Sequence, residues 1–120
     1  MMRIMLKSKI SYATVTETEL YYKGSITIDE AIIKEADLRE HERVDILNLN
    51  TGARLQTYVI KGKKGSGVIC LNGPAARSAY KGDKVIIVSY GTFSDEELKT
   101  LKTKFVELDD GNKIKNSYLA

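Results

Sequence analysis

The sequence predicts a mainly β protein, a β-barrel with short helices, that forms a single domain over residues 1–120. Three observations support this fold class. Short β-branched runs alternate with turn residues, which is typical of an all-β domain. The helical patterns between these runs are brief. No repeat, linker or low-complexity segment divides the chain, and 120 residues support one hydrophobic core.

The first third of the chain should contain strands and one helix. Residues 2–16 predict a long strand, with a second short strand starting at residues 20–22 and a third at residues 25–28. The even-numbered face of the first strand carries Ile4, Leu6, Ile10, Tyr12, Thr14 and Thr16. Asp29 is a good N-cap for a helix over residues 30–36.

The middle of the chain predicts two strands and a loop. Residues 44–49 and 54–60 form strands joined by a turn at residues 50–53, where Gly52 suits a positive φ. Residues 61–67 form a loop rich in glycine and lysine, and residues 67–71 form another strand.

The last third predicts further strands between brief helices. Pro74 suits the first turn of a short helix, and residues 84–90 predict a strand that is buried on both faces. Ser94 and Glu97 have the spacing of a capping box. Residues 105–115 predict a final hairpin, after which the chain should fray.

The composition argues against several functional classes. The formal net charge is +3, and basic and acidic residues are interspersed, which does not favour a nucleic-acid partner. No apolar stretch approaches the roughly 20 residues of a membrane span, so we expect no membrane partner. Cys70 is the only cysteine, and the amino terminus lacks the apolar region of a signal peptide. We therefore expect a cytoplasmic protein.

Familiar catalytic constellations are also missing. His41 is the only histidine, and one histidine with one cysteine excludes the usual zinc sites, so we expect no metal. The glycine-rich residues 62–67 lack the spacing of a phosphate-binding loop. An enzyme built from this chain must use Ser, Tyr, Lys, Arg or carboxylates, or a group that it makes from itself.

The pair Gly24-Ser25 could provide such a group, although by spacing alone it is a turn. Attack of the Ser25 hydroxyl on the Gly24 carbonyl carbon is an N→O acyl shift, which needs a distorted peptide bond and a donor for the oxyanion. Arg54 and Tyr58 share one face of a predicted strand, and Thr57 points to the other face. The default readings of Lys9 and Asn72-Gly73 are an exposed lysine and a turn.

Taken together, these segments resemble bacterial aspartate 1-decarboxylases, the pyruvoyl-dependent family. The resemblance runs from about Arg3 to Lys115 in unbroken order. It rests on Lys9-Ile10, Thr14-Val15-Thr16, residues 20–29, residues 50–58, Cys70-Leu71-Asn72-Gly73, Ala75-Ala76-Arg77 and residues 82–87.

The resemblance implies a double-psi β-barrel that assembles as a homotetramer with active sites between subunits. It also implies autocatalytic cleavage between Gly24 and Ser25, into a β chain of residues 1–24 and an α chain of residues 25–120. Ser25 would become a covalent pyruvoyl group that forms a Schiff base with L-aspartate. Decarboxylation then yields β-alanine and carbon dioxide, upstream of pantothenate and coenzyme A.

The resemblance also assigns roles to single residues. Thr57 assists cleavage and contacts substrate, and Tyr58 is the proton donor. Lys9 and Arg54 supply positive charge, and we expect Arg54 to bind the carboxylate that the substrate retains. The remaining residues expected to bind substrate are Tyr22, Asn72, Gly73, Pro74 and Ala75.

The chain departs from the family pattern at two places. Ser11-Tyr12 replaces a common His-Arg pair, and Pro74 replaces a common alanine and has no N–H to donate. Two alternatives to this enzyme stay open: a nucleic-acid-binding barrel and a barrel that no longer matures. A requirement for a maturation factor also stays open.

Overall fold

The computed structural model describes residues 1–22 and 24–120, and these residues form mainly strands, as predicted. The strands are β1 (Met2–Thr14), β2 (Glu17–Glu19), β3 (Ser25–Asp29), β4 (Arg43–Asn48), β5 (Arg54–Gly62), β6 (Ile69–Asn72), β7 (Lys84–Ser94), β8 (Lys104–Leu108) and β9 (Ile114–Leu119). Three short helical segments accompany them: α1 (Glu30–Glu35), the 3₁₀ helix η1 (Gly73–Ser78) and α2 (Asp95–Leu98).

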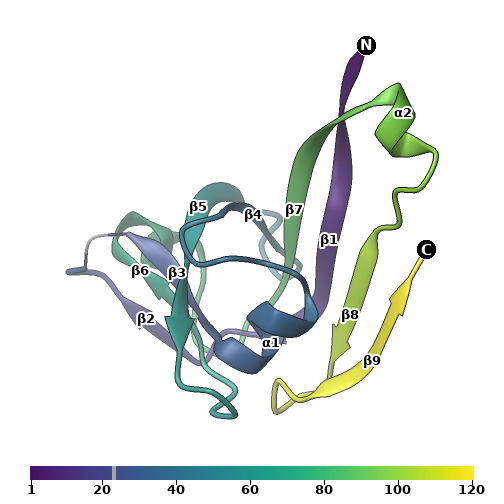
Figure 1. Cartoon of the computed structure of the whole chain (residues 1–120). Helices are drawn as coiled ribbons and strands as arrows, with labels where there is room; N and C mark the ends of the chain where they lie inside the picture. The colour runs from purple at the N-terminus through teal and green to yellow at the C-terminus, as the bar shows by residue number, and fades with distance from the viewer. Residues whose placement is uncertain (23) are drawn as a thin grey trace.

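The strands of the described residues form one mixed sheet in the order β2-β6-β3-β5-β4-β7-β1-β8-β9. The pairs β1–β8, β2–β6 and β3–β5 are parallel, whereas the other neighbours are antiparallel. The sheet curls around a core, with α1 against it (Figure 1). This arrangement is mainly β, as expected, and is consistent with a double-psi β-barrel.

The chain crosses the end of β6 just before Ser25. Glu19 at the end of β2 and Ser25 at the start of β3 both pair with Asn72, on opposite sides of β6. Residues 20–24 therefore join two strands that have a third strand between them, which is a ψ connection. The short strand predicted from residue 20 is wrong, because the chain turns at Leu20 and Tyr21 to make this crossing.

The long strand β1 changes its buried face part of the way along. Its pairing with β7 shifts register between Ile10 and Ala13, and Tyr12 has a positive φ of 63°. This bulge moves the buried positions from even to odd numbers, so that Ala13 is buried and Tyr12 is 53% exposed. The predicted single even-numbered face is therefore wrong beyond Ile10.

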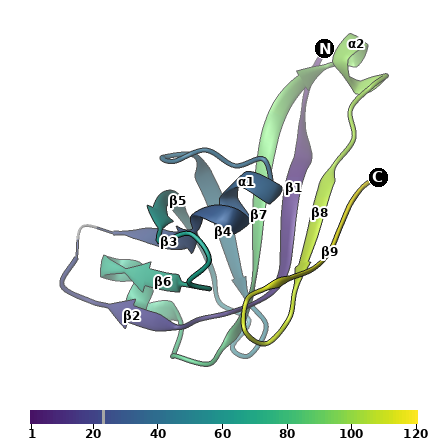
Figure 2. The same cartoon turned by 60° about the horizontal axis from the view of Figure 1, so that its bottom comes forward.

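The core residues come mostly from the strands and from α1, which lies against the curled sheet in Figure 2. Asp29 caps α1, as predicted, by accepting from the Ala31 amide. The same buried carboxylate accepts from the amides of Gly65 and Gly67. It therefore fixes the loop after β5 next to the end of β3.

The amino-terminal half of β1 and the carboxyl-terminal half of β7 project from the barrel, with α2 at their tip (Figure 1). Met2, Ile4 and Tyr90 are exposed on this projection. The capping box predicted at Ser94 and Glu97 is confirmed. The expected fraying of the carboxyl terminus is wrong, because Ala120 and Thr103 exchange two backbone hydrogen bonds of 2.8 and 3.0 Å.

Candidate active site

A pocket of about 480 Å³ opens beside Ser25, where β6, β3 and β5 lie side by side. Its walls include seven of the residues predicted from the sequence: Gly24, Ser25, Thr57, Tyr58, Asn72, Pro74 and Ala75. Leu55, Gln56 and Ser78 complete the lining. The non-sequential strand order thus brings three distant segments of the chain to one place.

The backbone around the expected cleavage bond has an uncommon conformation. Ser25 is fully buried and has a φ of +139°, and Gly24 before it has a φ of +87°. A side-chain-bearing residue rarely adopts such a positive φ, and conformations of this kind concentrate at functional sites. The peptide bond between Gly24 and Ser25 therefore joins two residues of positive φ, which is strained at Ser25 and tolerated by the glycine.

Asn72 holds the Ser25 hydroxyl. Its Nδ2 donates to Ser25 Oγ at 2.8 Å and to Thr27 Oγ1 at 2.9 Å. Its Oδ1 accepts from the Cys70 thiol at a sulfur–oxygen distance of 3.2 Å. Burial, with smaller contributions from the nearby Glu17 and Glu19, raises the pKa of the Cys70 thiol to about 11.

Gly73 lies directly against the backbone before Ser25. A Cβ added to Gly73 would come within 2.5 Å of the backbone nitrogen of Gly24 and 2.6 Å of the backbone carbonyl oxygen of Tyr22. Gly73 also has a positive φ of 62°. Only glycine fits this approach. Gly73 and Tyr22 therefore border the site through their backbones. The Tyr22 side chain is 54% exposed. Lys23 lies outside the described residues.

Pro74 begins the short helix η1, as predicted, and lines the pocket. Its Cδ would lie 3.7 Å from a Cβ on Gly24, which places the proline ring near the expected cleavage bond. Because Pro74 has no N–H, the amides available to a ligand at this turn are those of the other residues.

Thr57 and Tyr58 come from β5 and both line the pocket. The strand alternates as predicted, with Thr57 on the partly buried face and Tyr58 on the more exposed face at 37% exposure. The Tyr58 ring meets the ring of His41 edge-on, with centroids 6.2 Å apart. His41 is exposed, as its charged neighbours suggested.

Arg54 and Lys9 lie outside this pocket in a single chain. Arg54 is exposed and lines an adjoining hollow that shares Leu55 and Gln56 with the Ser25 pocket. Lys9 of β1 pairs with Val88 of β7, and Val88 pairs with Asp45 of β4. Asp45 in turn pairs with Gln56 of β5. Lys9 therefore lies three strand spacings from Gln56, about 14 Å when followed along the curled sheet.

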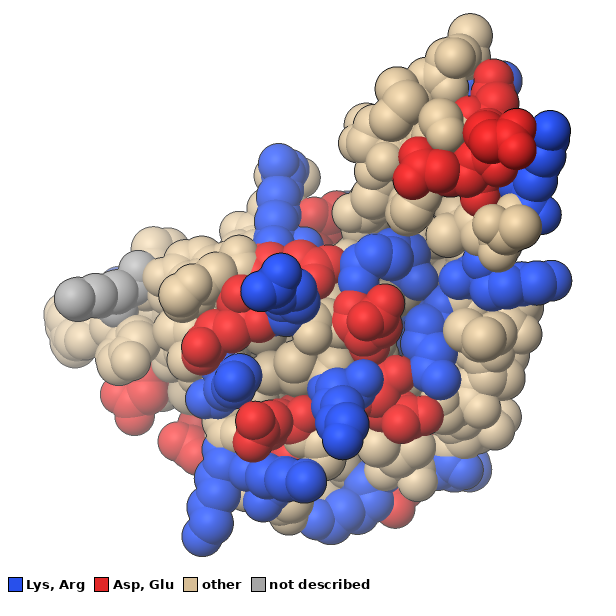
Figure 3. Space-filling model, in the orientation of Figure 1, with Lys and Arg blue, Asp and Glu red and all other residues tan. Residues whose placement is uncertain are grey.

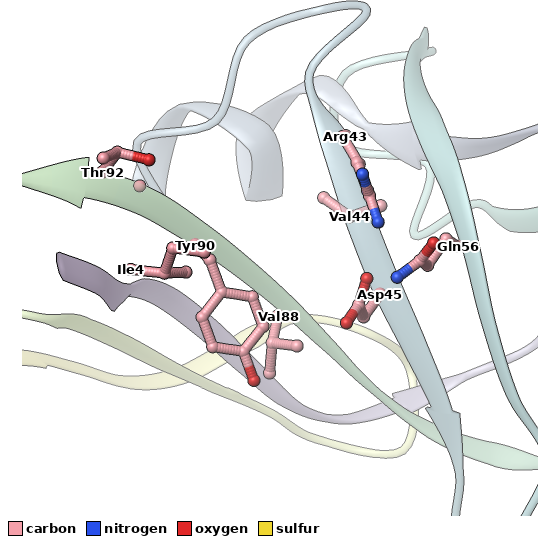
Figure 4. Close-up of a pocket in the computed structure, with 9 residues that line it drawn as sticks. Ile4, Arg43, Val44, Asp45, Gln56, Val88, Tyr90 and Thr92 are labelled. Atoms are coloured by element: carbon pink, nitrogen blue, oxygen red, sulfur yellow. The ribbon is translucent and has the colours of Figure 1, made fainter. Parts of the chain in front are cut away.

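A further pocket of about 270 Å³ lies on the face of the sheet between these two regions. Figure 4 shows Val88 and Tyr90 of β7 on one side and Arg43, Asp45 and Gln56 on the other. Exposed charged and apolar groups thus line the surface that separates Lys9 from the Ser25 pocket.

The face drawn in Figure 3 shows no large patch made of Lys and Arg alone. Lys and Arg lie among Asp and Glu on this face, and Arg3 and Lys99 pair with acidic residues of α2. Within residues 1–22 and 24–120, no helix has the length and apolar character that crossing a membrane requires. Across the same residues, no three His, Cys, Asp or Glu side chains gather as a metal site.

Sequence reasoning did not single out several residues that shape the pocket. Alternation along β5 could have grouped Leu55 with Thr57, since both occupy odd positions. Thr27 and Cys70 gave no signal of their own, because their contacts with Asn72 depend on the pairing of β3 with β6.

Comparison with known proteins extends the likeness beyond the site. Residues 1–115 match the family described as Aspartate decarboxylase. The chain is 57% identical over 114 residues to aspartate 1-decarboxylase of Listeria monocytogenes serovar 1/2a, covering 95% of this chain and 90% of the relative. It is 54% identical to that of Bacillus cereus strain B4264, with the same coverage. It is 55% identical over 112 residues to that of Acetivibrio thermocellus, covering 93% and 89% of the two chains. The resemblance noted in the sequence is confirmed, and the chain belongs to the aspartate decarboxylase family of carboxy-lyases.

Proposed function

We propose that this chain cleaves itself between Gly24 and Ser25 and then decarboxylates L-aspartate to β-alanine and carbon dioxide. The observation that carries the proposal is the buried Ser25, whose hydroxyl is held by Asn72 beside a pocket that Thr57 and Tyr58 line. We further propose that the reaction takes place in the cytoplasm and supplies pantothenate and coenzyme A synthesis.

The cleavage step follows from the position of the Ser25 hydroxyl. Ser25 Oγ forms a bond to the Gly24 carbonyl carbon, its proton passes to the Ser25 nitrogen, and the carbon–nitrogen bond breaks to leave an ester. The Thr57 hydroxyl, in the same pocket, is the donor that we assign to the developing oxyanion. The strained torsion at Ser25 favours a reaction that removes it.

The ester then becomes the prosthetic group. Loss of the Ser25 Cα proton expels the Gly24 carboxylate and leaves dehydroalanine, which takes up water and releases ammonia to give a pyruvoyl group. The pocket fits this product, because Asn72 offers an N–H and the space beside residue 25 is open to a small ligand. When formed, the pyruvoyl group would supply a keto carbon that condenses with the substrate amine and an adjacent amide carbonyl that delocalises the electrons released by decarboxylation.

The chain's other residues would bind substrate and return a proton. Arg54 binds the side-chain carboxylate that aspartate retains, since strong pairing to the departing carboxylate would stabilise the ground state. Tyr58 Oη donates a proton to the carbon that has lost carbon dioxide, a role that its place at the pocket supports. Asn72, Gly73, Pro74 and Ala75 form the substrate-binding turn, next to Tyr22.

We propose that the complete site forms between copies of the chain in a homotetramer. Lys9 lies three strands from Gln56, about 14 Å along the curled sheet, and it does not line the Ser25 pocket of the same chain. A neighbouring copy can supply it instead. The exposed Met2, Ile4 and Tyr90 offer apolar surface for such an assembly.

Intact-mass spectrometry under denaturing conditions tests the proposal. The wild-type chain should yield fragments of residues 1–24 and 25–120, the larger with a hydrazine-reactive amino terminus, and should release β-alanine from aspartate. The Ser25→Ala variant should remain one chain, whereas Ser66→Ala, in an exposed loop, should cleave normally. A wild-type chain that stays intact both alone and in a cell extract able to supply a maturation factor would contradict the proposal.

A further inference from the structure

The Asn72 carboxamide is held from both sides by neighbouring side chains. It is only 3% exposed, and both of its polar atoms have partners inside the protein. The pairing of β3 with β6 sets Ser25 opposite Asn72 and Thr27 opposite Cys70. Because residues two apart in a strand share a face, these four side chains form a square across two strands.

The orientation of this amide follows from the number of acceptors on each side. The NH₂ group has two hydrogens, and the Ser25 and Thr27 oxygens accept one each. The opposite side offers only the Cys70 sulfur, which is a weak acceptor. A reversed amide would leave a buried N–H without a good partner, which proteins rarely tolerate.

The Cys70 thiol favours the same orientation of the Asn72 amide as Thr27 does. Its raised pKa keeps it protonated at neutral pH, so that it remains a donor toward Asn72 Oδ1. Thr27 thus provides the second acceptor for the amide nitrogen, and Cys70 provides the donor for the amide oxygen.

We propose that Thr27 and Cys70 are positioning residues for self-cleavage, which fix the Asn72 amide with its N–H toward Ser25 Oγ. This inference rests on the proposed cleavage between Gly24 and Ser25. As Oγ bonds to the Gly24 carbonyl carbon and its proton passes to the Ser25 nitrogen, the Asn72 N–H keeps the oxygen in place and stabilises its partial negative charge. A reversed amide would present Oδ1, which would accept a hydrogen bond from the Ser25 hydroxyl and hold its proton away from the Ser25 nitrogen.

The test follows the rate of cleavage after a pulse of cell-free synthesis, by denaturing mass spectrometry. Thr27→Val keeps the shape of the side chain but removes the acceptor, and should slow cleavage about tenfold. Cys70→Ala removes the donor and should also slow cleavage, by a smaller factor. Thr27→Ser keeps the hydroxyl acceptor, and Cys70→Ser replaces the thiol donor by a hydroxyl donor, so both variants should cleave within about twofold of wild type.

The melting temperature of each variant, measured on its uncleaved Ser25→Ala form, separates positioning from general destabilisation. Rates that recover in the serine variants while melting temperatures vary independently support the inference. Wild-type rates in both Thr27→Val and Cys70→Ala overturn it. Rates that simply follow the melting temperature, with no recovery in the serine variants, overturn it as well. A wild-type chain that never cleaves overturns the proposed function instead.

Discussion

The Ser25 pocket and the outer face around Arg54 are built partly from the same strand, β5. They differ in how many of their expected functional groups one chain brings together. On the pocket side, Ser25 is buried and hydrogen-bonded to Asn72, and the polar neighbours of that amide all come from one chain. On the outer face, Arg54 is exposed, and Lys9 lies three strands away. We propose that one chain positions the bond between Gly24 and Ser25 on its own, whereas binding a charged substrate needs a neighbouring copy.

Mixing two inactive variants gives the sharpest test of this contrast. Lys9→Ala retains Ser25, and Ser25→Ala retains Lys9, so neither homotetramer contains a complete site. In co-expressed mixtures, about a quarter of the sites should regain both groups if these come from different copies. Decarboxylation assays on the purified mixture should therefore show activity well above that of either parent. Activity no higher than the parents' sum would mean that the two residues do not meet across copies.

Replacing Tyr58 by phenylalanine should separate cleavage from turnover. The variant should still cleave, because the groups that hold Ser25 are intact, but should lose about 10²- to 10⁴-fold in kcat with the proton donor gone. Intact mass measures the first effect and release of β-alanine the second. Tyr80→Phe, which changes an exposed tyrosine between η1 and β7, is the matched control. Near-normal turnover in Tyr58→Phe would remove Tyr58 as the proton donor.

Two glycines with similar φ values can separate the effect of the close contact between Gly73 and Gly24 from the effect of the torsion itself. Gly73 and Gly52 have φ values of 62° and 76°, but only a Cβ at Gly73 meets other atoms. Gly52→Ala should cost about 1–2 kcal/mol of unfolding free energy from its torsion alone. Gly73→Ala should cost more and should also slow cleavage, because Gly24 must move. Denaturant titration and intact mass measure the two effects, and equal costs for both variants would show that the contact with Gly24 is unimportant.

The smallest effect we expect concerns Asp29 and pH. Burial raises the pKa of Asp29, but the amides of Gly67, Gly65 and Ala31 outweigh this and hold it below the ordinary carboxyl value. Its stabilisation is therefore fully present above that ordinary pKa, near 4, and is lost as the pH falls through the lower pKa of the folded state.

The variant Asp29→Asn should reduce the unfolding free energy by about 1 kcal/mol at neutral pH. This difference from wild type should shrink as the pH falls below about 4. Denaturant titrations at several pH values measure it, with Asp95→Asn on the exposed helix α2 as control. A difference that stays constant down to acid pH would assign the effect to packing and not to charge.

Local patterns predicted most of the elements, and the failures have local causes. The N-cap at Asp29 and the capping box at Ser94 depend only on residues within one turn, and both are confirmed. The face of β1 beyond Ile10 was predicted wrongly, because a bulge adds a residue that alternation cannot reveal. The strand expected from residue 20 failed because the crossing over β6 is a property of the whole sheet.

The candidate site was less accessible to pattern reasoning than the fold. Seven predicted residues share one pocket because β6, β3 and β5 are neighbours, an order that spacing along the chain does not contain. The resemblance to a family supplied that information. Thr27 and Cys70 were missed even so, because their side chains matter only through the amide of Asn72.

The ψ connection at residues 20–24 has a mechanical consequence for a chain cut after Gly24. The amino-terminal piece would contain all of β1 and β2, which pair with β7, β8 and β6 of the other piece. Two polypeptides would then share a single sheet, so that neither can leave without breaking its ladders. The product would unfold as a bimolecular assembly, and its apparent stability would rise with protein concentration.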